Sequence, residues 1–443
     1  MDGRPGRLAE SRSAGLYERA VRVLPGGVNS PVRAMRSIGR DPIFLERGDG
    51  PCVWDVDGNR YVDWVCSWGP LILGHAHPAV VEAVRVAAGE GTSFGAPTEG
   101  EVELAEAVAE RFESVEMVRM TSSGTEASMS AIRVARAATG RDPILRFSGA
   151  YHGHVDGLLA EAGSGLATAG VPASPGVTAA QAADAVIVPW NDPGAVTKAL
   201  GEREFAAVIA EPIPANMGIV PPDDGFLEQL RRGSDENGAV LILDEVISGF
   251  RVARGGAQEL LGVDADLTVM GKVLGGGLPA AAYGGPRELM ERVAPAGDVY
   301  QAGTLSGNPL AVAAGLATLA ELDADAYRRL GELTSELGHG LAQVARDRPV
   351  RVVFGGPVEP WPPATAFPGL LTVFFSAEPP RDFSQASASD TEAYGRFCRA
   401  MLERGVYPPP SQFEAWFPSL AHDEEAIGVT VEAAAEAFEE ALG

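Results

Sequence analysis

The middle of the chain alternates short apolar runs of strand length with segments whose apolar residues recur at helical spacing. Runs such as residues 206–211 and 239–244 are almost continuously apolar, which is typical of strands buried on both faces of a sheet. Between two such runs, Met129, Ile132 and Ala135 recur every three residues, as on one face of a helix. This alternation predicts an α/β fold with a mostly parallel, seven-stranded sheet and helices on both faces. The expected strands are residues 117–121, 143–147, 185–189, 206–211, 239–244, 267–271 and 280–284.

The two ends of the chain depart from this pattern. Residues 50–65 carry an Asp-Gly turn between strand-like, aromatic-rich residues, which favours a small hairpin. Residues 370–375 predict one strand between long irregular loops, and helical patterns follow Ala311 and close the sequence. We therefore expect a large α/β domain at residues 71–310. A smaller α+β domain would combine an N-terminal segment, 1–70, with a C-terminal part, 311–443.

The 443 residues carry 35 basic and 60 acidic side chains, a formal net charge of −25. Binding to nucleic-acid phosphates depends on clustered lysine and arginine, so this balance argues against a nucleic-acid partner. The longest apolar stretch, residues 310–320, is too short to span a bilayer, and no apolar segment of a secretory signal is visible. The three cysteines are scattered and form no CxxC pair. We expect a cytoplasmic protein without membrane contact.

A small, glycine-containing turn follows the first expected strand, directly before a helix. Its sequence is Ser122-Ser123-Gly124-Thr125-Glu126. Such a turn presents backbone N–H groups and the positive end of a helix dipole to a phosphate. The alternative is an ordinary helix cap, in which a hydroxyl satisfies the N–H groups of the first turn. The turn matches neither the P-loop nor the dinucleotide-binding glycine pattern, so nucleotides are less favoured.

A carboxylate and a lysine end two further expected strands. Asp244 ends a buried run, where a carboxylate requires a cation or hydrogen bonds; a structural ion pair is the alternative. Lys272 lies in an apolar context that continues into Gly275–Gly277, and a desolvated lysine is a nucleophile towards carbonyls; a surface lysine is the alternative. Ligands of open α/β sheets bind at the carboxyl ends of strands. The turn at residues 122–126, called the phosphate turn below, completes the set. Together these residues suit pyridoxal 5′-phosphate, which requires a Schiff-base lysine and an acidic partner for its ring nitrogen.

Two His-x-His pairs occur, at His75/His77 and His152/His154. Such a pair can bind zinc, but no third ligand follows at a suitable spacing, so we expect no metal site. Tyr151 precedes the second pair, and its ring is an alternative source of function for this segment because it can stack on a planar ligand.

Six segments together resemble the class III aminotransferases, which are fold type I pyridoxal-phosphate enzymes. Three further stretches, residues 25–35, 162–177 and 408–423, are similar to the glutamate-1-semialdehyde aminomutases rather than to general ω-aminotransferases. The resemblance covers almost the whole chain. The six segments are SSGTEA, YHGHVDG, EPIPANMG, LDEVISGFR, GKVLGGGLPAAAYGG and YQAGTLSGNP.

The resemblance implies roles for residues around a pyridoxal phosphate that cycles with pyridoxamine phosphate. Lys272 would hold the cofactor covalently and move protons between substrate carbons. Asp244 would pair with the ring nitrogen, while Val246 and Tyr151 would lie against opposite faces of the ring. Glu414 would lie near the substrate amine or the lysine.

The same resemblance implies that the phosphate and the ring edge are bound by further residues. Ser123, Gly124 and Thr125 would bind the phosphate through the turn. Asn216 would hydrogen-bond to the ring hydroxyl. Thr304 would reach the phosphate of a neighbouring subunit, so that a homodimer would share its active sites.

Four residues would bind the substrate: Ser30, Arg33, Trp68 and Ser164, the last within a lid at residues 162–177. The arginine would pair with a substrate carboxylate. The implied reaction is the isomerisation of (S)-4-amino-5-oxopentanoate to 5-aminolevulinate, in tetrapyrrole synthesis. The resemblance also suggests that the reductase which supplies this aldehyde is a partner. The alternative is an ω-aminotransferase that acts on another amino acid or amine and needs an external acceptor. A non-catalytic member of the fold is disfavoured by the intact lysine, aspartate and phosphate turn.

Overall fold

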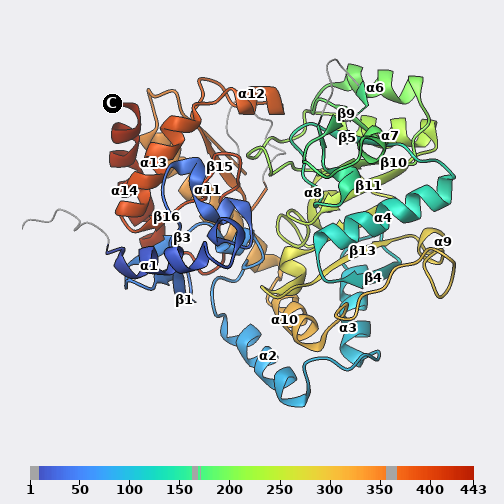
Figure 1. Cartoon of the computed structure of the whole chain (residues 1–443), viewed down its shortest axis with the longest axis horizontal. Helices are drawn as coiled ribbons and strands as arrows, with labels where there is room; N and C mark the ends of the chain where they lie inside the picture. The colour runs from blue at the N-terminus through green and yellow to red at the C-terminus, as the bar shows by residue number, and fades with distance from the viewer. Residues whose placement is uncertain (1–8, 162–167, 170, 356–366) are drawn as a thin grey trace, which may run out of the picture. The chain divides into compact units, whose positions relative to one another are not determined.

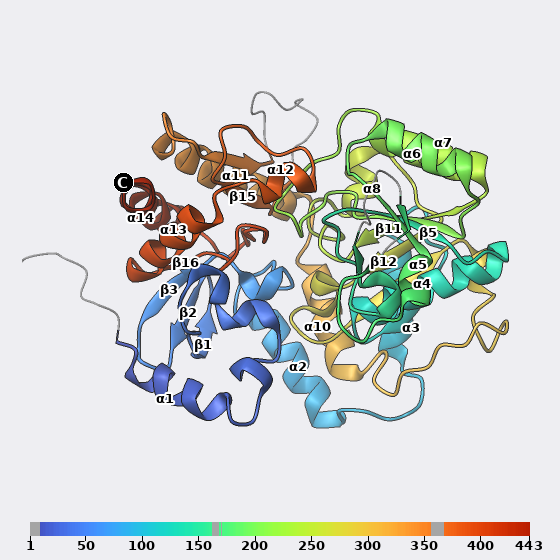
Figure 2. The same cartoon turned by 45° about the horizontal axis from the view of Figure 1, so that its top comes forward.

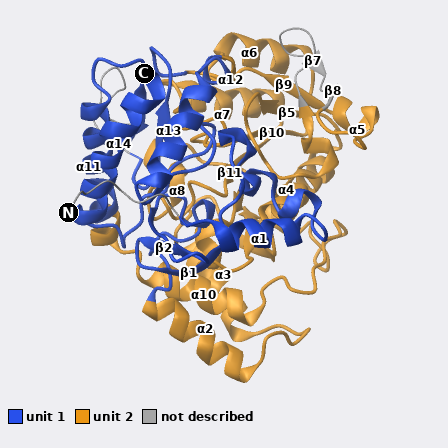
Figure 3. Cartoon of the chain, turned by 60° about the vertical axis from the view of Figure 1, so that its left-hand side comes forward, with its two compact units in different colours: residues 1–77, 328–380, 385–443 blue, residues 78–327, 381–384 orange. Residues whose placement is uncertain are grey.

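The computed structural model describes residues 9–161, 168–169, 171–355 and 367–443, which form two compact units (Figure 3). Unit 1 comprises residues 1–77, 328–380 and 385–443, and unit 2 comprises residues 78–327 and 381–384. Unit 1 thus combines both ends of the chain, and unit 2 contains its middle. The expected domain limits, at residues 70 and 310, stay a prediction.

Unit 2 is built on one sheet of eight strands, most of them parallel (Figure 1). All seven expected strands are present, which confirms the predicted fold class, and the two-residue β7 adds an eighth at one edge. Only β13 and β7 run against the direction of their neighbours within this sheet of described residues. The order is β4 (Met117–Thr121), β13 (Ala281–Gly285), β12 (Leu267–Met270), β11 (Val240–Glu245), β10 (Ala207–Ala210), β5 (Ile144–Phe147), β9 (Ala185–Val188), β7 (Thr168–Ala169).

Helices cover both faces of this sheet, as the alternating pattern predicts (Figure 2). On one face, Ala127 and Ala131 of α4 share a buried cluster with Ile209 and Ile242 of the strands. On the other face lie α6 and α7, which pack against each other. The helices of unit 2 are α2 (Pro78–Glu90), α3 (Glu99–Ala109), α4 (Gly124–Thr139), α5 (Ala179–Ala183), α6 (Pro193–Glu202), α7 (Phe226–Asn237), α8 (Gly256–Leu261), α9 (Arg287–Met290) and α10 (Pro309–Ala320).

Unit 1 contains a four-stranded sheet and a separate antiparallel strand pair. The sheet has the order β1 (Leu45–Asp49), β2 (Cys52–Asp55), β3 (Arg60–Asp63), β16 (Val406–Tyr407), so the expected hairpin is β2 and β3. The separate pair is β14 (Arg351–Phe354) and β15 (Leu371–Phe374), the latter being the strand expected at 370–375. The helices are α1 (Ser11–Ala20), α11 (Ala324–Val344) and α12 (Phe383–Ser387), which both begin in unit 2, α13 (Thr391–Glu403) and α14 (Glu424–Leu442).

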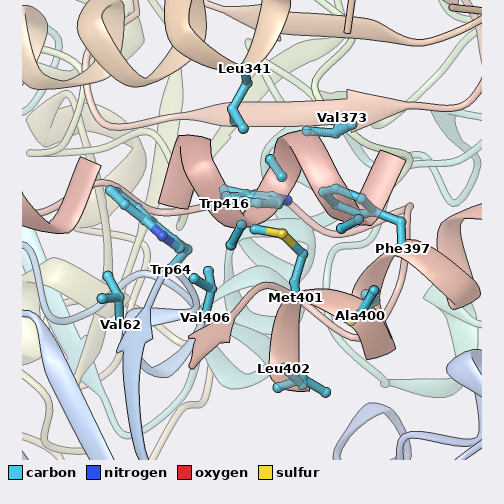
Figure 4. Packing of buried hydrophobic residues seen from close by; sticks show 14 of the residues in the cluster. Val62, Trp64, Leu341, Val373, Phe397, Ala400, Met401, Leu402, Val406 and Trp416 are labelled. Atoms are coloured by element: carbon cyan, nitrogen blue, oxygen red, sulfur yellow. The ribbon is translucent and has the colours of Figure 1, made fainter. Parts of the chain in front are cut away.

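The core of unit 1 joins the two ends of the chain through aromatic packing (Figure 4). Trp64 follows β3, and its ring centroid lies 6.3 Å from that of Trp416 near the C-terminus. The Trp64 indole Nε1 donates a hydrogen bond of 2.9 Å to the Thr430 hydroxyl of α14. Phe397 of α13 stacks on Phe438 of α14 at 4.6 Å between centroids. This shared core confirms the small α+β domain formed from both chain ends. No helix in the described ranges is both long and apolar enough to cross a membrane.

The turn after β12 packs closely against α10 because both carry glycine at the contact. Gly276 has a φ of +56°, and a Cβ there would lie 2.6 Å from the Ala314 carbonyl oxygen. A Cβ at Gly315 of α10 would overlap the carbonyl oxygen of Leu274. Gly276 and Gly315 therefore allow the turn after β12 and α10 to approach each other closely.

Replacing Gly315 with alanine is expected to destabilise the protein by about 1–3 kcal/mol, because the added methyl group overlaps backbone. The matched control is Gly428→Ala in α14, where a Cβ would contact nothing within 4 Å. Alanine forms helices better than glycine, so this variant is expected to gain about 0.5–1 kcal/mol. In thermal denaturation, the midpoint temperature should fall in Gly315→Ala and rise in Gly428→Ala. Midpoints that shift in the same direction would contradict this packing.

Candidate active site

The expected site residues of unit 2 follow the carboxyl ends of parallel strands, at one edge of the sheet. Asp244 lies within β11 and is paired with Val269 of β12. Lys272 follows Val269 by three residues. The structure thus brings the lysine loop and the carboxylate to the same edge, where open α/β sheets bind ligands. The other strands that end here are β4, before the phosphate turn, β5, before Tyr151, and β10, before Asn216.

Asp244 is buried and bound to a histidine that the sequence did not single out for this role. The His152 Nδ1–H donates a hydrogen bond of 2.7 Å to Asp244 Oδ2, and both side chains are at least 96% buried. The backbone N–H of Val246 donates to the other oxygen, Oδ1, at 3.0 Å. Each carboxylate oxygen therefore has a donor, and the carboxylate is held in one orientation without a fixed cation on the strand.

The neighbouring carboxylate, Glu245, has a different environment because successive side chains of a strand point to opposite faces. It accepts hydrogen bonds from the backbone N–H groups of Ala257 (3.0 Å) and Gln258 (2.9 Å) and from the Ser248 hydroxyl. Burial raises the pKa of Glu245, and these donors oppose the rise. Glu245 thus caps α8 and has a structural role, which leaves Asp244 as the candidate site residue of the two.

The turn before α4 combines the two interpretations that the sequence left open. Ser123 is the N-cap residue, and its hydroxyl accepts from the backbone N–H of Glu126 at 3.3 Å. The Glu126 carboxylate reaches back to the N–H of Ser122 at 2.8 Å. The N–H groups of Gly124 and Thr125 lie in the first helical turn, where no carbonyl of the helix can accept them. The turn is therefore a capped helix that still offers donors to an anion.

The phosphate turn packs against the other strand ends through two glycines. A Cβ at Gly124 would lie 3.2 Å from Val246. Gly153 has a φ of +95°, and a Cβ there would lie 2.6 Å from the Thr125 Cα. The backbone N–H of His154 donates to the Thr125 hydroxyl at 3.3 Å. These contacts bring Val246, the phosphate turn and the segment after Tyr151 together.

Tyr151 is 50% exposed, although it belongs to this packed segment. Burial of the other half, together with the charge of Asp244, raises the pKa of Tyr151, and a hydrogen bond with Thr125 opposes the rise. The phenol therefore keeps its proton at neutral pH. An exposed ring face beside the phosphate turn suits stacking on a planar ligand.

A second buried carboxylate, Glu211, connects two of the expected residues. Its Oε1 accepts from the backbone N–H of Tyr151 at 3.0 Å. Its Oε2 accepts from the Asn216 side-chain amide at 2.8 Å and from the backbone N–H of Ala215 at 3.1 Å. Burial raises the pKa of Glu211, while the charge of His152 and the two backbone donors oppose the rise.

Lys272 begins the one-turn segment η6 (Lys272–Gly275) after β12, and its side chain is partly buried. Its φ of +48° lies in the left-handed region that side chains other than glycine seldom adopt. Such strain persists only where the surroundings enforce it, and here the turn is enclosed by α10. Thr304, by contrast, lies on an exposed turn of unit 2.

The expected substrate residues of the chain ends lie in unit 1, so the structure does not relate them to Lys272. Ser30 is the N-cap residue of η2 (Pro31–Ala34), and Arg33 within that segment is exposed. Glu414 is partly buried. Ser164 lies outside the described residues.

Trp68 lies in a strained turn that a buried aspartate anchors. Cys66, Ser67 and Trp68 have φ angles of 43°, 58° and 71°, three consecutive residues in the left-handed region. The Asp63 carboxylate accepts from the backbone N–H groups of Val65 (2.8 Å) and Cys66 (3.2 Å). It also bonds to the His75 Nε2 at 2.7 Å.

His422 hydrogen-bonds to the backbone carbonyl of the same aspartate. Its Nδ1 accepts from the backbone N–H of Ser419 at 3.0 Å, so the proton is on Nε2, which donates to the Asp63 carbonyl oxygen at 3.0 Å. The ring stacks on Trp64 at 3.9 Å between centroids. Burial lowers the pKa of His422 to about 4, so this histidine is neutral at pH 7.

Sequence reasoning missed three of these residues, namely His152, Glu211 and Asp63. The sequence offers His75 and His152 as possible metal ligands, whereas each bonds to a buried carboxylate. The partner of His152 is 92 positions away, so spacing alone could not identify it. The position of Glu211 at the end of an expected strand was the available signal.

Comparisons with known proteins give one consistent family. Residues 35–353 match the family model described as aminotransferase class-III. The glutamate-1-semialdehyde 2,1-aminomutase of Syntrophobacter fumaroxidans is 54% identical over 97% of this chain and 98% of its own length. Among solved structures, an omega-transaminase from Sphaerobacter thermophilus has a TM-score of 0.88 at 34% identity, covering 99% of both chains. A glutamate-1-semialdehyde-aminomutase from Pseudomonas aeruginosa PAO1 in complex with PMP has a TM-score of 0.86 at 28% identity, covering 97% of this chain and 95% of that one.

Removing the histidine beside Asp244 should destabilise the protein far more than removing the next histidine. His152→Ala leaves a buried carboxylate oxygen without its donor, which is expected to cost about 2–4 kcal/mol. His154→Ala, two residues further at an exposed position, should change stability by less than about 0.5 kcal/mol. Urea denaturation measures the free energy of unfolding of both variants. Equal losses of this free energy would show that the His152 contact contributes little to stability.

The buried His422 should make stability depend on pH. Its pKa is about 6.5 in the unfolded chain and about 4 in the folded one, so the unfolded state binds more protons between these values and stability falls as pH drops. From pH 7 to pH 5 the loss is about 2 kcal/mol.

The corresponding test compares His422→Asn with His339→Asn, which changes an exposed histidine of α11. His422→Asn should be less stable at pH 7 but should lose less stability than the natural protein on acidification, as measured by denaturation at each pH. His339→Asn should keep the natural slope. An unchanged slope in His422→Asn would be evidence against a neutral buried imidazole.

Proposed function

Because this chain belongs to the class III aminotransferase family, we propose that it converts (S)-4-amino-5-oxopentanoate to 5-aminolevulinate with pyridoxal 5′-phosphate as cofactor. The observation that carries this assignment is identity of 52–55% to glutamate-1-semialdehyde 2,1-aminomutases over nearly the whole chain. The enzyme is then an isomerase that moves an amino group between neighbouring carbons of one substrate, in the pathway to tetrapyrroles.

An ω-aminotransferase on the same fold is the alternative. It is favoured by the TM-score of 0.88 to an omega-transaminase structure, but that likeness comes with only 34% identity. Members of one family share their backbone more widely than their substrates, so fold likeness discriminates poorly between the two activities. The higher identity to the aminomutases therefore decides the proposal.

The residues at the strand ends fit pyridoxal phosphate. The N-terminal turn of α4 offers backbone N–H groups to a phosphate, and Asp244 is a buried carboxylate suited to a protonated ring nitrogen. Bound pyridoxal phosphate supplies an aldehyde that takes up amines covalently and a ring that accepts electrons. Val246 packs beside Gly124, and the half-exposed Tyr151 hydrogen-bonds with Thr125 of the same turn, which supports places for both residues next to the cofactor ring.

Lys272 would act twice in this site. Its Nζ would anchor the cofactor, and the same amine, once released, would move a proton between the two substrate carbons that exchange the amino group. Asp244, held by His152 and the Val246 N–H, would keep its negative charge aimed at the ring nitrogen throughout. The protonated phenol of Tyr151 could donate a hydrogen bond near the phosphate turn.

The substrate carboxylate would be bound by residues of the chain ends. Arg33 is an exposed cation whose planar guanidinium matches a carboxylate in two hydrogen bonds. Ser30 and Trp68 would line the same end, and the anchoring of the Trp68 turn by Asp63 supports a precise position for that ring. Glu414 near the substrate amine and Ser164 in a lid stay parts of this proposal.

A homodimer would complete the site through Thr304. The turn that carries Thr304 is exposed, and Gly307 beyond it packs on Glu101 of α3, so the turn and α3 are neighbours. Large apolar side chains are exposed on these segments, as expected of a surface that another subunit covers. They are Val102 of α3 and Tyr300 and Leu305 beside Thr304. A cytoplasmic location and contact with the reductase that supplies the aldehyde remain further proposals.

The decisive assay supplies the purified holoenzyme with glutamate 1-semialdehyde and no amino acceptor. We expect stoichiometric formation of 5-aminolevulinate, because the amino group returns to the same carbon skeleton. An ω-aminotransferase would form product only after an external acceptor is added, and that result would overturn the proposal.

Two lysine variants accompany this assay. Lys272→Ala should lose at least about 10³-fold in turnover, because the covalent anchor and the proton carrier are both removed. Lys198→Ala, at an exposed position on α6, should convert the semialdehyde at the natural rate.

A further inference from the structure

Glu211 makes the polar contacts that join two of the proposed cofactor-binding residues, yet it has no role in the proposed reaction. We infer that Glu211 is a positioning residue that fixes Tyr151 and Asn216 around the cofactor ring. This inference rests on the proposed function, since it concerns residues that contact the proposed cofactor.

The two oxygens of Glu211 hold two different loops. Oε1 accepts from the backbone N–H of Tyr151, in the loop after β5, and Oε2 accepts from the Asn216 amide, in the loop after β10. The strands β5 and β10 are adjacent and parallel. One carboxylate therefore sets the separation between a ring proposed to stack on the cofactor and an amide proposed to bind its hydroxyl.

The contact also decides which way the Asn216 amide points. An asparagine amide has a donor end and an acceptor end of nearly equal shape, and only its hydrogen bonds select one orientation. Glu211 accepts and cannot donate when ionised, so the Asn216 nitrogen must face it. One N–H and the carbonyl oxygen of Asn216 are then left in a fixed arrangement for the cofactor.

The groups that hydrogen-bond to Glu211 are all donors, so an acceptor is required at both oxygens. They are the backbone N–H groups of Tyr151 and Ala215 and the Asn216 amide, at 2.8–3.1 Å. Glutamine has the same size but places an NH₂ group against at least one of these donors. Glu211→Gln should thus disturb the arrangement without opening a cavity.

Glu245 provides a matched control within the same sheet. It is equally buried, it follows an apolar run, and it accepts from two backbone N–H groups and a hydroxyl. Its partners belong to α8 and its preceding turn, and none of them is a proposed cofactor contact. Glu245→Gln therefore reports the cost of altering a buried carboxylate without altering the site.

The experiment measures the dissociation constant of pyridoxamine 5′-phosphate for the apoprotein, because this form binds without the covalent bond to Lys272. Glu211→Gln should raise that constant at least about tenfold, a loss of about 1.4 kcal/mol. Glu245→Gln should lower the thermal midpoint but leave the constant within about twofold of the natural value. If Glu211→Gln gives no folded protein, Glu211→Asp replaces it, and the shorter carboxylate should also weaken binding.

A double-mutant cycle with Asn216→Ala tests the route of the effect. If Glu211 acts through Asn216, the double variant should lose less affinity than the product of the two single losses. Unchanged affinity in Glu211→Gln, equal losses in Glu211→Gln and Glu245→Gln, or a double variant whose loss equals that product would overturn the inference. Since these measurements need no turnover, failure of the semialdehyde assay would overturn the proposed function and leave this test standing.

Discussion

The buried hydrogen bond between His152 and Asp244 is the interaction on which the site depends. A carboxylate in the interior of a sheet is costly unless donors meet its oxygens, and here the His152 ring and one backbone N–H do so at 2.7 and 3.0 Å. Neither donor belongs to a lysine or arginine. Asp244 therefore suits a positively charged partner from outside the chain, such as a protonated pyridine nitrogen.

The architecture explains why this carboxylate, a lysine and a phosphate turn can meet. Six parallel strands end at one edge of the unit 2 sheet, and the loops after them carry the chemistry. Glycines let these loops approach closely, as at Gly153 beside Thr125. Non-local carboxylates then fix the loops, with Glu211 between two of them in unit 2 and Asp63 beneath the Trp68 turn in unit 1. Within unit 2 the sheet and Glu211 hold two of these loops, and within unit 1 Asp63 holds the Trp68 turn.

Much of the fold could be predicted from sequence because buried parallel strands are continuous apolar runs. All seven expected strands are present, six of them parallel and β13 antiparallel, and Asp244 and Lys272 were identified because each lies at the end of such an apolar run. The roles of His152, Glu211 and Asp63 could not be found this way, since each depends on a partner brought near only by folding. The packing of Gly276 against α10 could not be found either, because sequence does not reveal which element a glycine will contact. The positions of Arg33 and Trp68 relative to Lys272 also stay predictions, because they lie in the other unit.

The central claim is that Lys272 forms the covalent bond to pyridoxal phosphate, and reductive trapping tests it directly. The chain contains only two lysines, Lys198 and Lys272. Borohydride reduction followed by peptide mass spectrometry therefore has to distinguish only these two side chains and the N-terminal amine. We predict that the phosphopyridoxyl mass appears on the peptide containing Lys272 and is absent from the peptide containing Lys198. A label on Lys198, on the N-terminal amine, or on no peptide of a cofactor-loaded protein would contradict the account.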